Sequence, residues 1–213
     1  MRHDQGAGAM QCGRPGFTLI ELMVTLAIVT VLLVLAVPSL QDATLNTQLR
    51  AQSNALLASL QLARSEAIKR NARVVVCKTA DWTATDPACT TSNGWEQGWI
   101  VFHDCDNDAN RDTNTCPGGT AETVIDRHQP LANGFLLRGG GNVANYISFK
   151  PSGSTLMTSG AFQSGSLTLC RSPPAFSSAG KQIVISAVGR ARICDTNPLT
   201  ACPPASLAEN CQS

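Results

Sequence analysis

Residues Phe17 to Val37 form an apolar segment of 21 residues in which Glu21 is the only charged side chain. A helix rises about 1.5 Å per residue, so this segment would span roughly 30 Å, the thickness of the hydrocarbon core of a bilayer. A helix of this length in a water-soluble core would carry polar residues at helical spacing, and only scattered threonines occur here. The sequence therefore predicts a transmembrane segment over residues 17–37.

The residues before this segment are polar and end in Gly16. A secretory signal peptide would be cleaved after its apolar stretch, next to small residues, and Ala36-Val37-Pro38 matches such a site poorly. The letters GFTLIELMV, which begin at Gly16, resemble the processing signature of type IV pilins and pseudopilins. This resemblance implies that the prepilin peptidase cleaves between Gly16 and Phe17, that Phe17 is N-methylated, and that residues 1–16 are a leader.

Glu21 lies five residues into the chain that this cleavage would leave. A carboxylate near the centre of a spanning helix costs about 2.5–3.5 kcal/mol on insertion scales, so it usually has a partner. The pilin resemblance implies that the partner is the amine of Phe17 on a neighbouring subunit, which would make Glu21 an assembly residue. A glutamate tolerated at the membrane edge is the alternative. The expected partners of this segment are therefore other pilins or pseudopilins, the prepilin peptidase and the inner membrane.

The chain has nine cysteines in 213 residues, too many for an ordinary cytosolic domain. Such cysteines bind metal or form disulfides in an oxidising compartment. Zinc is disfavoured because no C-x-x-C pair occurs and no histidine joins the cysteines at ligand spacing. Removal of the leader takes away Cys12 and leaves eight cysteines, an even number that is expected to pair.

Pairing of cysteines that are neighbours in the sequence predicts four disulfides: Cys77–Cys89, Cys105–Cys116, Cys170–Cys194 and Cys202–Cys211. The first two would close loops of about a dozen residues, and the third would be a cross-strand bridge. The fourth would close the C-terminal loop, as similar bridges do in many pilins. Eight cysteines allow 105 pairings, so the sequence also permits many other schemes.

Apolar residues recur at helical spacing beyond Pro38: Leu45, Leu49, Leu56, Leu60, Ala63 and Ala67. The pattern predicts one long helix from about Phe17 to Arg70, whose amphipathic half, residues 38–72, lays its apolar stripe on a globular head. Basic residues gather at the end of this helix: Arg64, Lys69, Arg70 and Arg73. Cations are favourable at a helix C-terminus, so we expect a solvated end there rather than a binding patch.

From Val74 onward the apolar pattern changes to that of strands. Short β-branched or aromatic runs are separated by Gly, Pro, Asn and Asp, and they lie at residues 74–77, 98–103, 123–126, 135–138, 146–150, 167–170 and 183–188. One long N-terminal helix packed on an antiparallel β-sheet head, residues 73–213, is an α+β arrangement and that of the pilin fold. The letters GWIVFHD, which begin at Gly98, and the Asp/Asn-rich loop after them resemble the GspH/FimT subfamily of minor pilins.

Acidic and amide side chains alternate along that loop: Asp104, Asp106, Asp108, Asn110 and Asp112. Every second side chain could point toward one hard cation, so the spacing makes the loop a weak calcium candidate. The EF-hand pattern also requires Gly at its sixth place and Glu at its twelfth, where Ala109 and Thr115 stand here. A turn-rich loop held by side-chain-to-backbone hydrogen bonds and a Cys105–Cys116 bridge is the favoured alternative, with no metal and no cofactor.

The charges of the expected mature chain are segregated along the sequence. Residues 79–132 carry nine acidic and two basic side chains, whereas residues 133–213 carry six basic and two acidic ones. The basic region contains the letters GRAR, residues 189–192. On a strand, Arg190 and Arg192 would face the same side and present two guanidinium groups together. Surface arginines that bridge to acidic neighbours such as Asp195 are the alternative.

This GRAR stretch resembles the GRxR motif of FimT-type minor pilins, which bind DNA during natural transformation. The resemblance implies a site for double-stranded DNA at Arg190 and Arg192, where Gly189 would let a phosphate backbone come close. Lys181 and Arg171 would add lesser contacts from adjacent strands. No aromatic residue interleaves with these arginines, so base stacking is not expected to contribute.

Catalysis finds no support in the sequence. The chain lacks the phosphate-binding pattern G-x-x-x-x-G-K-[ST], and neither His103 nor His128 stands in a nucleophile arrangement. We therefore expect a non-enzymatic subunit anchored in the bacterial inner membrane by one pass, with its head in the periplasm, that later joins a pilus or pseudopilus. A minor type IV pilin of a pilus tip or initiating complex is the favoured function. A GspH-like pseudopilin of a type II secretion system is the main alternative, and a host-surface adhesin is a weaker one.

Overall fold

The structure is a computed structural model that describes residues 16–113, 116–171 and 180–195, without the side chains of residues 34–42 and 195. The backbone divides into two compact units, and the boundary between them lies between Thr44 and Leu45. The first unit contains the N-terminal part of the helix, and the second contains the remainder of the helix together with the strands.

The predicted long helix is confirmed as α1, Leu19–Arg70. The hydroxyl oxygen of Thr18 accepts a hydrogen bond from the backbone N–H of Glu21 at 3.3 Å, which caps the start of the helix. Thr18 and Glu21 have the spacing of a capping box, in which a Glu three residues after the cap favours the helix start. At the other end, Asn71 has a φ of 50° and stops the helix in a left-handed conformation.

Within the part of the chain that the structure describes, no helix combines the length and the apolar character that crossing a membrane requires. This finding does not confirm the transmembrane segment predicted over residues 17–37. The side chains of residues 34–37 in that segment lie outside the described ones. Large apolar side chains between Phe17 and Leu33 are exposed in the single chain.

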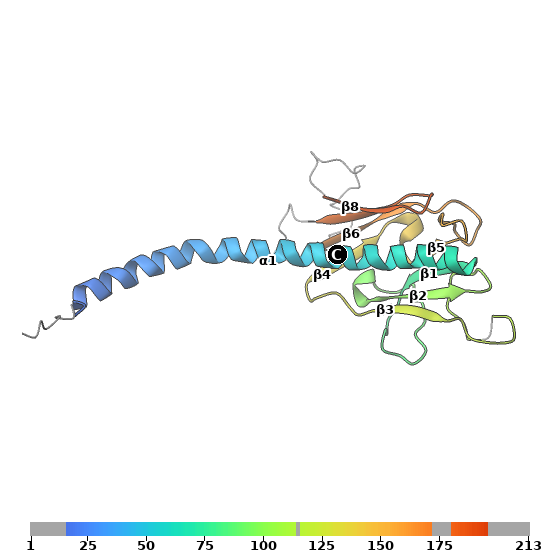
Figure 1. Cartoon of the computed structure of the whole chain (residues 1–213), viewed down its shortest axis with the longest axis horizontal. Helices are drawn as coiled ribbons and strands as arrows, with labels where there is room; N and C mark the ends of the chain where they lie inside the picture. The colour runs from blue at the N-terminus through green and yellow to red at the C-terminus, as the bar shows by residue number, and fades with distance from the viewer. Residues whose placement is uncertain (1–15, 114–115, 172–179, 196–213) are drawn as a thin grey trace, which may run out of the picture. The chain divides into compact units, whose positions relative to one another are not determined.

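The head contains two antiparallel four-stranded sheets instead of the single sheet that the sequence predicted (Figure 1). The first sheet has the order β3-β2-β1-β5, with bounds Val124–His128, Trp99–Asp104, Arg73–Lys78 and Tyr146–Phe149. The second has the order β4-β6-β7-β8, with bounds Phe135–Gly139, Gly165–Arg171, Lys181–Ile185 and Ala191–Asp195. The local pattern marked most of these strands but could not reveal that β4 pairs with β6 rather than with β3.

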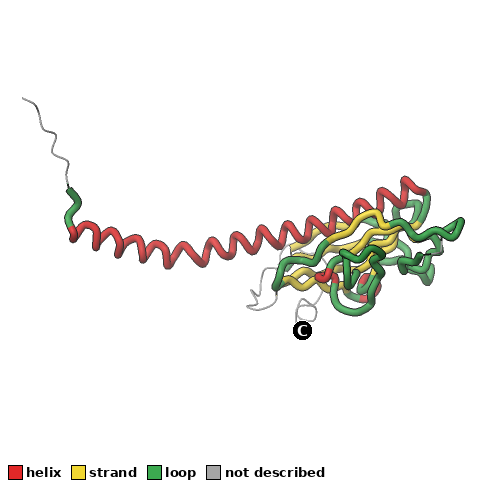
Figure 2. The backbone as a smooth tube through the Cα atoms, turned by 90° about the horizontal axis from the view of Figure 1, so that it is seen from below, coloured by secondary structure: helices red, strands yellow, loops and turns green. Residues whose placement is uncertain are grey.

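Short 3₁₀ turns, η1 at Trp95–Gln97 and η2 at Gly141–Val143, precede β2 and β5. The tube view shows the strands gathered along the C-terminal part of α1, within the second unit (Figure 2). Each strand of both sheets is joined to its neighbours by antiparallel ladders, which fixes which side chains face the helix.

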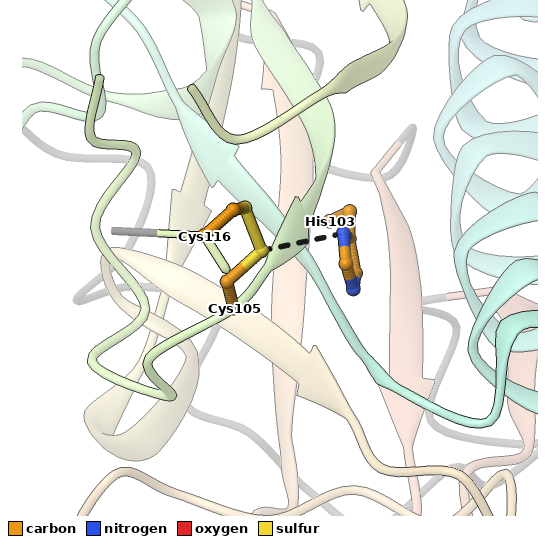
Figure 3. Close-up of side chains that lie close together, drawn as sticks. All are labelled: His103, Cys105 and Cys116. Carbon is orange, nitrogen blue, oxygen red and sulfur yellow. Dashed lines mark hydrogen bonds between the residues drawn. A yellow bond between two sulfur atoms is a disulfide. The ribbon is translucent and has the colours of Figure 1, made fainter. Parts of the chain in front are cut away.

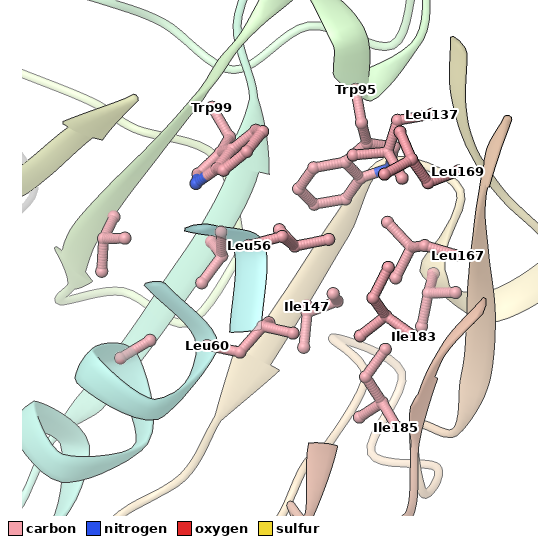
Figure 4. Packing of buried hydrophobic residues seen from close by; sticks show 14 of the residues in the cluster. Leu56, Leu60, Trp95, Trp99, Leu137, Ile147, Leu167, Leu169, Ile183 and Ile185 are labelled. Carbon is pink, nitrogen blue, oxygen red and sulfur yellow. The ribbon is translucent and has the colours of Figure 1, made fainter. Parts of the chain in front are cut away.

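One apolar core joins the helix to both sheets (Figure 4). The predicted helical stripe is buried at five positions: Leu49, Leu56, Leu60, Ala63 and Ala67. Leu56 and Leu60 pack with Trp99 and Ile147 of the first sheet and with Ile183 of the second. Because one stripe fills the space between two sheets, burial of these side chains is the main force that holds the C-terminal part of the helix to the strands.

Strand β1 is buried along its whole length because both of its faces are covered. Val74 and Val76 belong to the core that contains the helix stripe. Val75 and Cys77 point to the other face, where a second apolar cluster includes Ala109 of the acidic loop. The acidic loop therefore covers the outer face of the first sheet, which explains why β1 carries apolar side chains on both of its faces.

The structure contains two of the predicted local disulfides, Cys77–Cys89 and Cys105–Cys116. Their Cα atoms are 5.6 Å and 5.1 Å apart, within the ordinary range for disulfides. The first ties the end of β1 to the loop that follows it, and the second closes the acidic loop. Each bridge removes conformational freedom from the unfolded chain, which is worth about 3 kcal/mol for a loop of this size.

Cys170 and Cys194 are also disulfide-bonded, but the strand order does not fit the bridge predicted between them. Cys170 lies on β6 and Cys194 on β8, and β7 lies between these two strands. Two strand spacings place their Cα atoms roughly 9–10 Å apart, beyond the reach of a direct disulfide. Cys202 and Cys211, which were predicted to form the fourth disulfide, lie outside the described residues.

Candidate functional site

A groove of about 550 Å³ lies between α1 and the β7–β8 hairpin. Its lining contains three arginines and no acidic residue, and it consists of Leu60, Gln61, Arg64, Val184, Ser186, Gly189, Arg190, Ala191 and Arg192. Arg190 and Arg192 are both exposed, and the residue between them, Ala191, packs against the core. The sequence prediction that these two arginines act on the same side of the strand is consistent with this arrangement.

The side chains of these three arginines form no hydrogen bond or ion pair with the described residues, whereas Arg70, Arg111 and Arg138 each bind a carboxylate. Arg190 takes part only through its backbone, whose N–H donates to the hydroxyl of Ser186 at 3.2 Å. The side chain of Asp195, the acidic neighbour considered from the sequence, lies outside the described ones. The groove is thus a positively charged surface whose guanidinium donors are not used within the described part of the molecule.

The role predicted for Gly189 is wrong. Gly189 is buried, with a φ of 76°, in the turn of the β7–β8 hairpin. A Cβ atom there would lie 1.9 Å from the carbonyl oxygen of Gly153, so the backbone of another turn occupies the space that a phosphate was expected to approach. Gly189 shapes the hairpin and brings it against residues 150–155.

The structure does not bring Lys181 and Arg171 together with the arginines of the groove. Lys181 begins β7 and Arg171 ends β6, and the register places both at the end of the sheet opposite to the hairpin turn. Burial lowers the pKa of Lys181, and the positive charge of Arg50 on α1 lowers it further. The lesser contacts predicted for these two residues would therefore be made at a separate place.

The four basic residues predicted to form a solvated helix end have three different surroundings. Lys69 and Arg70 bind the carboxylate of Glu66, at 3.3 Å and 2.6 Å. The hydrogen bond from Arg70 is the largest cause of the lowered pKa of Glu66, and the bond from Lys69 is the second. Arg73 is buried, with its Nε 4.0 Å from the carboxylate of Asp104. Arg64 lines the groove, and sequence reasoning missed it, although its position four residues after Leu60 places it at the margin of the buried stripe.

The acidic loop is held by its own carboxylates. Both oxygens of the buried Asp104 accept backbone N–H groups, from Asn107 at 2.7 Å and Ala109 at 3.1 Å. Burial raises the pKa of Asp104 to about 7. Glu122 accepts the N–H groups of Cys105 and Asp112, and burial raises its pKa as well. The arrangement matches the alternative of a loop stabilised by side-chain-to-backbone hydrogen bonds.

Oxygens of Asp104, Asp106 and Asp108 lie within 4.8 Å of one another, and burial raises the pKa of Asp108. Asp106 accepts the N–H of Asp108, and Asp108 accepts that of Asn110. Asp112 does not belong to this group of carboxylates, so the structure brings together three of the four acids of the calcium candidate. Calcium binding stays a prediction at this loop.

We expect calcium to leave the melting temperature of the protein unchanged, because the loop carboxylates already accept backbone hydrogen bonds and Arg73 lies beside Asp104. Thermal melting in millimolar calcium and in excess chelator checks this expectation. Magnesium at the same concentration controls for ionic strength. A stabilisation that only calcium produces, and that Asp106→Asn removes, would show that the loop is a calcium site.

His103 lies beside the Cys105–Cys116 disulfide (Figure 3). Its Nδ1 is 3.5 Å from the Sγ of Cys105. These three side chains could bind a metal ion only if the two cysteines were reduced to thiols, and in this structure their sulfurs are bonded to each other. His103 therefore contacts a disulfide and not a pair of free thiols in this structure.

His128 stacks on Trp99, with ring centroids 3.8 Å apart and an interplanar angle of 3°. Burial lowers the pKa of His128 from its ordinary value near 6.5. The unfolded chain therefore takes up the proton first as the pH falls, and the stability that His128 contributes at neutral pH is lost below about 6.5.

We expect the stability difference between the parent and His128→Gln, both measured on residues 45–213, to be largest at pH 7.5 and to shrink toward pH 5. Glutamine cannot take up the proton, so only the parent loses this contribution on acidification. Urea unfolding at three pH values measures the difference, and His103→Gln serves as the control histidine. A difference that stays constant across this range would contradict the role of His128 protonation.

The predicted processing and assembly residues stand at the start of α1. Gly16 and Phe17 precede the helix, and Phe17 is 80% exposed. Glu21 is exposed in the first turn, and the described residues offer its carboxylate no ion pair. The single chain therefore leaves both the aromatic ring of Phe17 and the carboxylate of Glu21 available for contacts with other molecules.

A long N-terminal helix with an apolar, exposed first part, packed by its second part on antiparallel sheets, defines the chain as a pilin-like subunit. A family model described as Type II transport protein GspH matches residues 52–189, and one described as prokaryotic N-terminal methylation motif matches residues 13–37. The chain therefore belongs to the GspH family and is a minor pilin or pseudopilin. Among curated proteins, none matches the chain.

Solved structures of two such proteins are similar to the chain. The type IV minor pilin FimU of Pseudomonas aeruginosa is 15% identical, with a TM-score of 0.49 over 70% of this chain and 89% of that one. The minor pseudopilin EpsH from the type 2 secretion system of Vibrio cholerae is 12% identical, with a TM-score of 0.44 over 70% of this chain and 98% of that one.

Proposed function

We propose that this chain is a minor pilin of a type IV pilus, located at the pilus tip or in its initiating complex, and that its head binds double-stranded DNA during natural transformation. The groove beside the β7–β8 hairpin is the observation that supports DNA binding. Arg190 and Arg192 are exposed in it, unpaired among the described residues, and no acidic residue lines it. Unpaired guanidinium groups form strong charge-assisted hydrogen bonds with phosphate oxygens.

The proposal includes processing and anchoring of the N-terminus. The prepilin peptidase cleaves after Gly16, Phe17 becomes the methylated N-terminal residue, and the apolar helix anchors the chain once in the inner membrane with the head in the periplasm. The match to the N-terminal methylation motif over residues 13–37 supports this part. The disulfides of the head support an oxidising compartment. The proposal assigns the chain no catalytic role and no cofactor.

A pseudopilin of a type II secretion system is the second candidate, because the matching family is described as Type II transport protein GspH. Both candidates use the same N-terminal helix. Deletion of the gene separates them: loss of DNA uptake or of pili with normal protein secretion supports the pilin, and the reverse supports the pseudopilin. Neighbouring genes for competence and pili, or for secretion, provide the same distinction.

We expect the mature chain in non-ionic detergent to bind duplex DNA weakly and without sequence preference. Each phosphate contact that is lost lowers the salt slope of binding by about 0.9, so Arg190→Gln/Arg192→Gln should lower it by roughly 2. Fluorescence anisotropy at several salt concentrations measures the slope. Lys69→Gln/Arg70→Gln is the matched control, because it removes two cations that Glu66 already binds. Absence of parent binding at low salt, or equal binding by the Arg190/Arg192 variant, would contradict the DNA-binding proposal.

A further inference from the structure

Arg64 of α1 lies across the groove from the hairpin arginines, although about 130 residues separate it from them in the sequence. Its Nε is buried and has no hydrogen-bond partner. A Cβ atom on Gly153 would lie 3.1 Å from this Nε, so the turn at Gly153 covers one side of the guanidinium group. The two terminal nitrogens of Arg64 are not buried in this way, and they form no hydrogen bond with the described residues, so they can donate to a ligand in the groove.

We propose that Arg64 is a third phosphate-binding residue, so that a phosphodiester backbone lies in the groove between α1 and β8 instead of touching the hairpin alone. This inference rests on the proposed DNA binding. The groove then has two sides, with Arg64 on the helix and with Arg190 and Arg192 on the hairpin. The helix and the hairpin belong to one core, which holds the two sides at a set distance before the ligand arrives.

The charges around the groove favour an anion at this place. Glu66, the acidic residue nearest in sequence to Arg64, already binds Lys69 and Arg70. The acidic loop belongs to the first sheet, whereas the groove is formed by the second sheet and the helix. A phosphate in the groove would therefore meet a lining that contains three arginines and no carboxylate.

A purely structural role is the alternative for Arg64, because its side chain also packs beside Gly153 and Ile68. Two variants separate the roles. Arg64→Gln removes the charge, and Arg64→Lys keeps the charge but loses the planar fork of donors. Lys69→Gln removes one exposed cation of the same helix that does not line the groove, so it is the matched control.

The test measures the salt dependence of duplex DNA binding by the mature chain in non-ionic detergent, with circular dichroism to confirm folding. We expect Arg64→Gln to lower the salt slope by about 0.9 and to weaken binding several-fold at low salt. Arg64→Lys should keep the slope of the parent, and Lys69→Gln should leave both quantities unchanged. A structural role would lower the melting temperature in both Arg64 variants without changing the slope, and that result would overturn the inference.

The outcomes also separate this inference from the proposed function. If Arg190→Gln/Arg192→Gln loses DNA binding and Arg64→Gln keeps the parent slope, DNA binding stands and the role of Arg64 is wrong. If the parent does not bind DNA, the proposed function fails, and inorganic pyrophosphate then tests the groove by itself. A rise in melting temperature with pyrophosphate that Arg64→Gln abolishes would support a three-arginine anion site, and no rise in the parent would overturn it.

Discussion

Replacement of Glu21 by alanine is expected to reduce incorporation of the chain into filaments to background levels. Glu21 is the only charge in the apolar segment, and the described residues give its carboxylate no ion pair. In an assembly, the proposed partner is the methylated amine of Phe17 on the next subunit. A carboxylate left unpaired in an apolar surrounding costs several kcal/mol, and pairing with the Phe17 amine removes this cost when the subunit enters the filament. Immunoblots of sheared filaments measure the incorporated fraction.

The capping geometry of the helix start provides the control for this experiment. The N–H of Glu21 bonds to the hydroxyl of Thr18, and a Glu at this place also favours the helix. Glu21→Gln keeps the helix-start preference and removes the charge, so it should fail to assemble as Glu21→Ala does. Normal incorporation of the glutamine variant would show that helix capping, and not pairing of charge, is what assembly requires. Membrane levels of each variant confirm that the subunits are produced.

Replacement of Trp99 by alanine is expected to destabilise the head by about 3–5 kcal/mol. Trp99 is fully buried, its indole N–H donates to the hydroxyl of Ser59 on α1 at 3.0 Å, and its ring stacks on His128. The residue thus connects the helix, β2 and the end of β3, and alanine would leave a large cavity between them. Urea unfolding of residues 45–213, followed by far-UV circular dichroism, measures the loss.

Phe162→Ala is the matched control for this loss, because Phe162 is an aromatic residue of the same head that is 69% exposed. Its replacement should change the free energy of unfolding by no more than about 0.5 kcal/mol. A loss below about 1 kcal/mol in the Trp99 variant would contradict the view that this indole holds the helix on the first sheet.

The local sequence pattern was sufficient for the long helix and for most of the strands, but β8, Ala191–Asp195, was not among the predicted runs. The apolar stripe from Leu49 to Ala67 follows from the 3.6-residue period, and the helix ends near Arg70 as the periodicity predicted. Strand runs such as 74–77 and 98–103 were visible because side chains alternate and turn residues separate them. Two disulfides were visible because their cysteines are close in sequence. Each of these features depends on neighbours within about a dozen positions.

Pairing between distant strands was outside the reach of the sequence pattern. Period-two alternation marks a strand without naming its partner, so the division into two sheets, with β4 on β6 and β5 on β1, came only from the structure. The same division places β7 between Cys170 and Cys194 and removes the bridge predicted between them. These pairings are decided by which arrangement buries the most apolar surface around α1, which is a property of the whole chain.

The N-terminal motif from Gly16 to Glu21 and the arginines of GRAR are features that the sequence alone determined, because their chemistry lies in consecutive letters. Only the tertiary structure decided what surrounds those arginines. It places Arg64 across the groove from them, Lys181 at the far end of the sheet, and Gly189 against the backbone of Gly153. The physical reason is that a groove needs two walls, and here packing of a helix against a hairpin more than a hundred residues away brings those walls together.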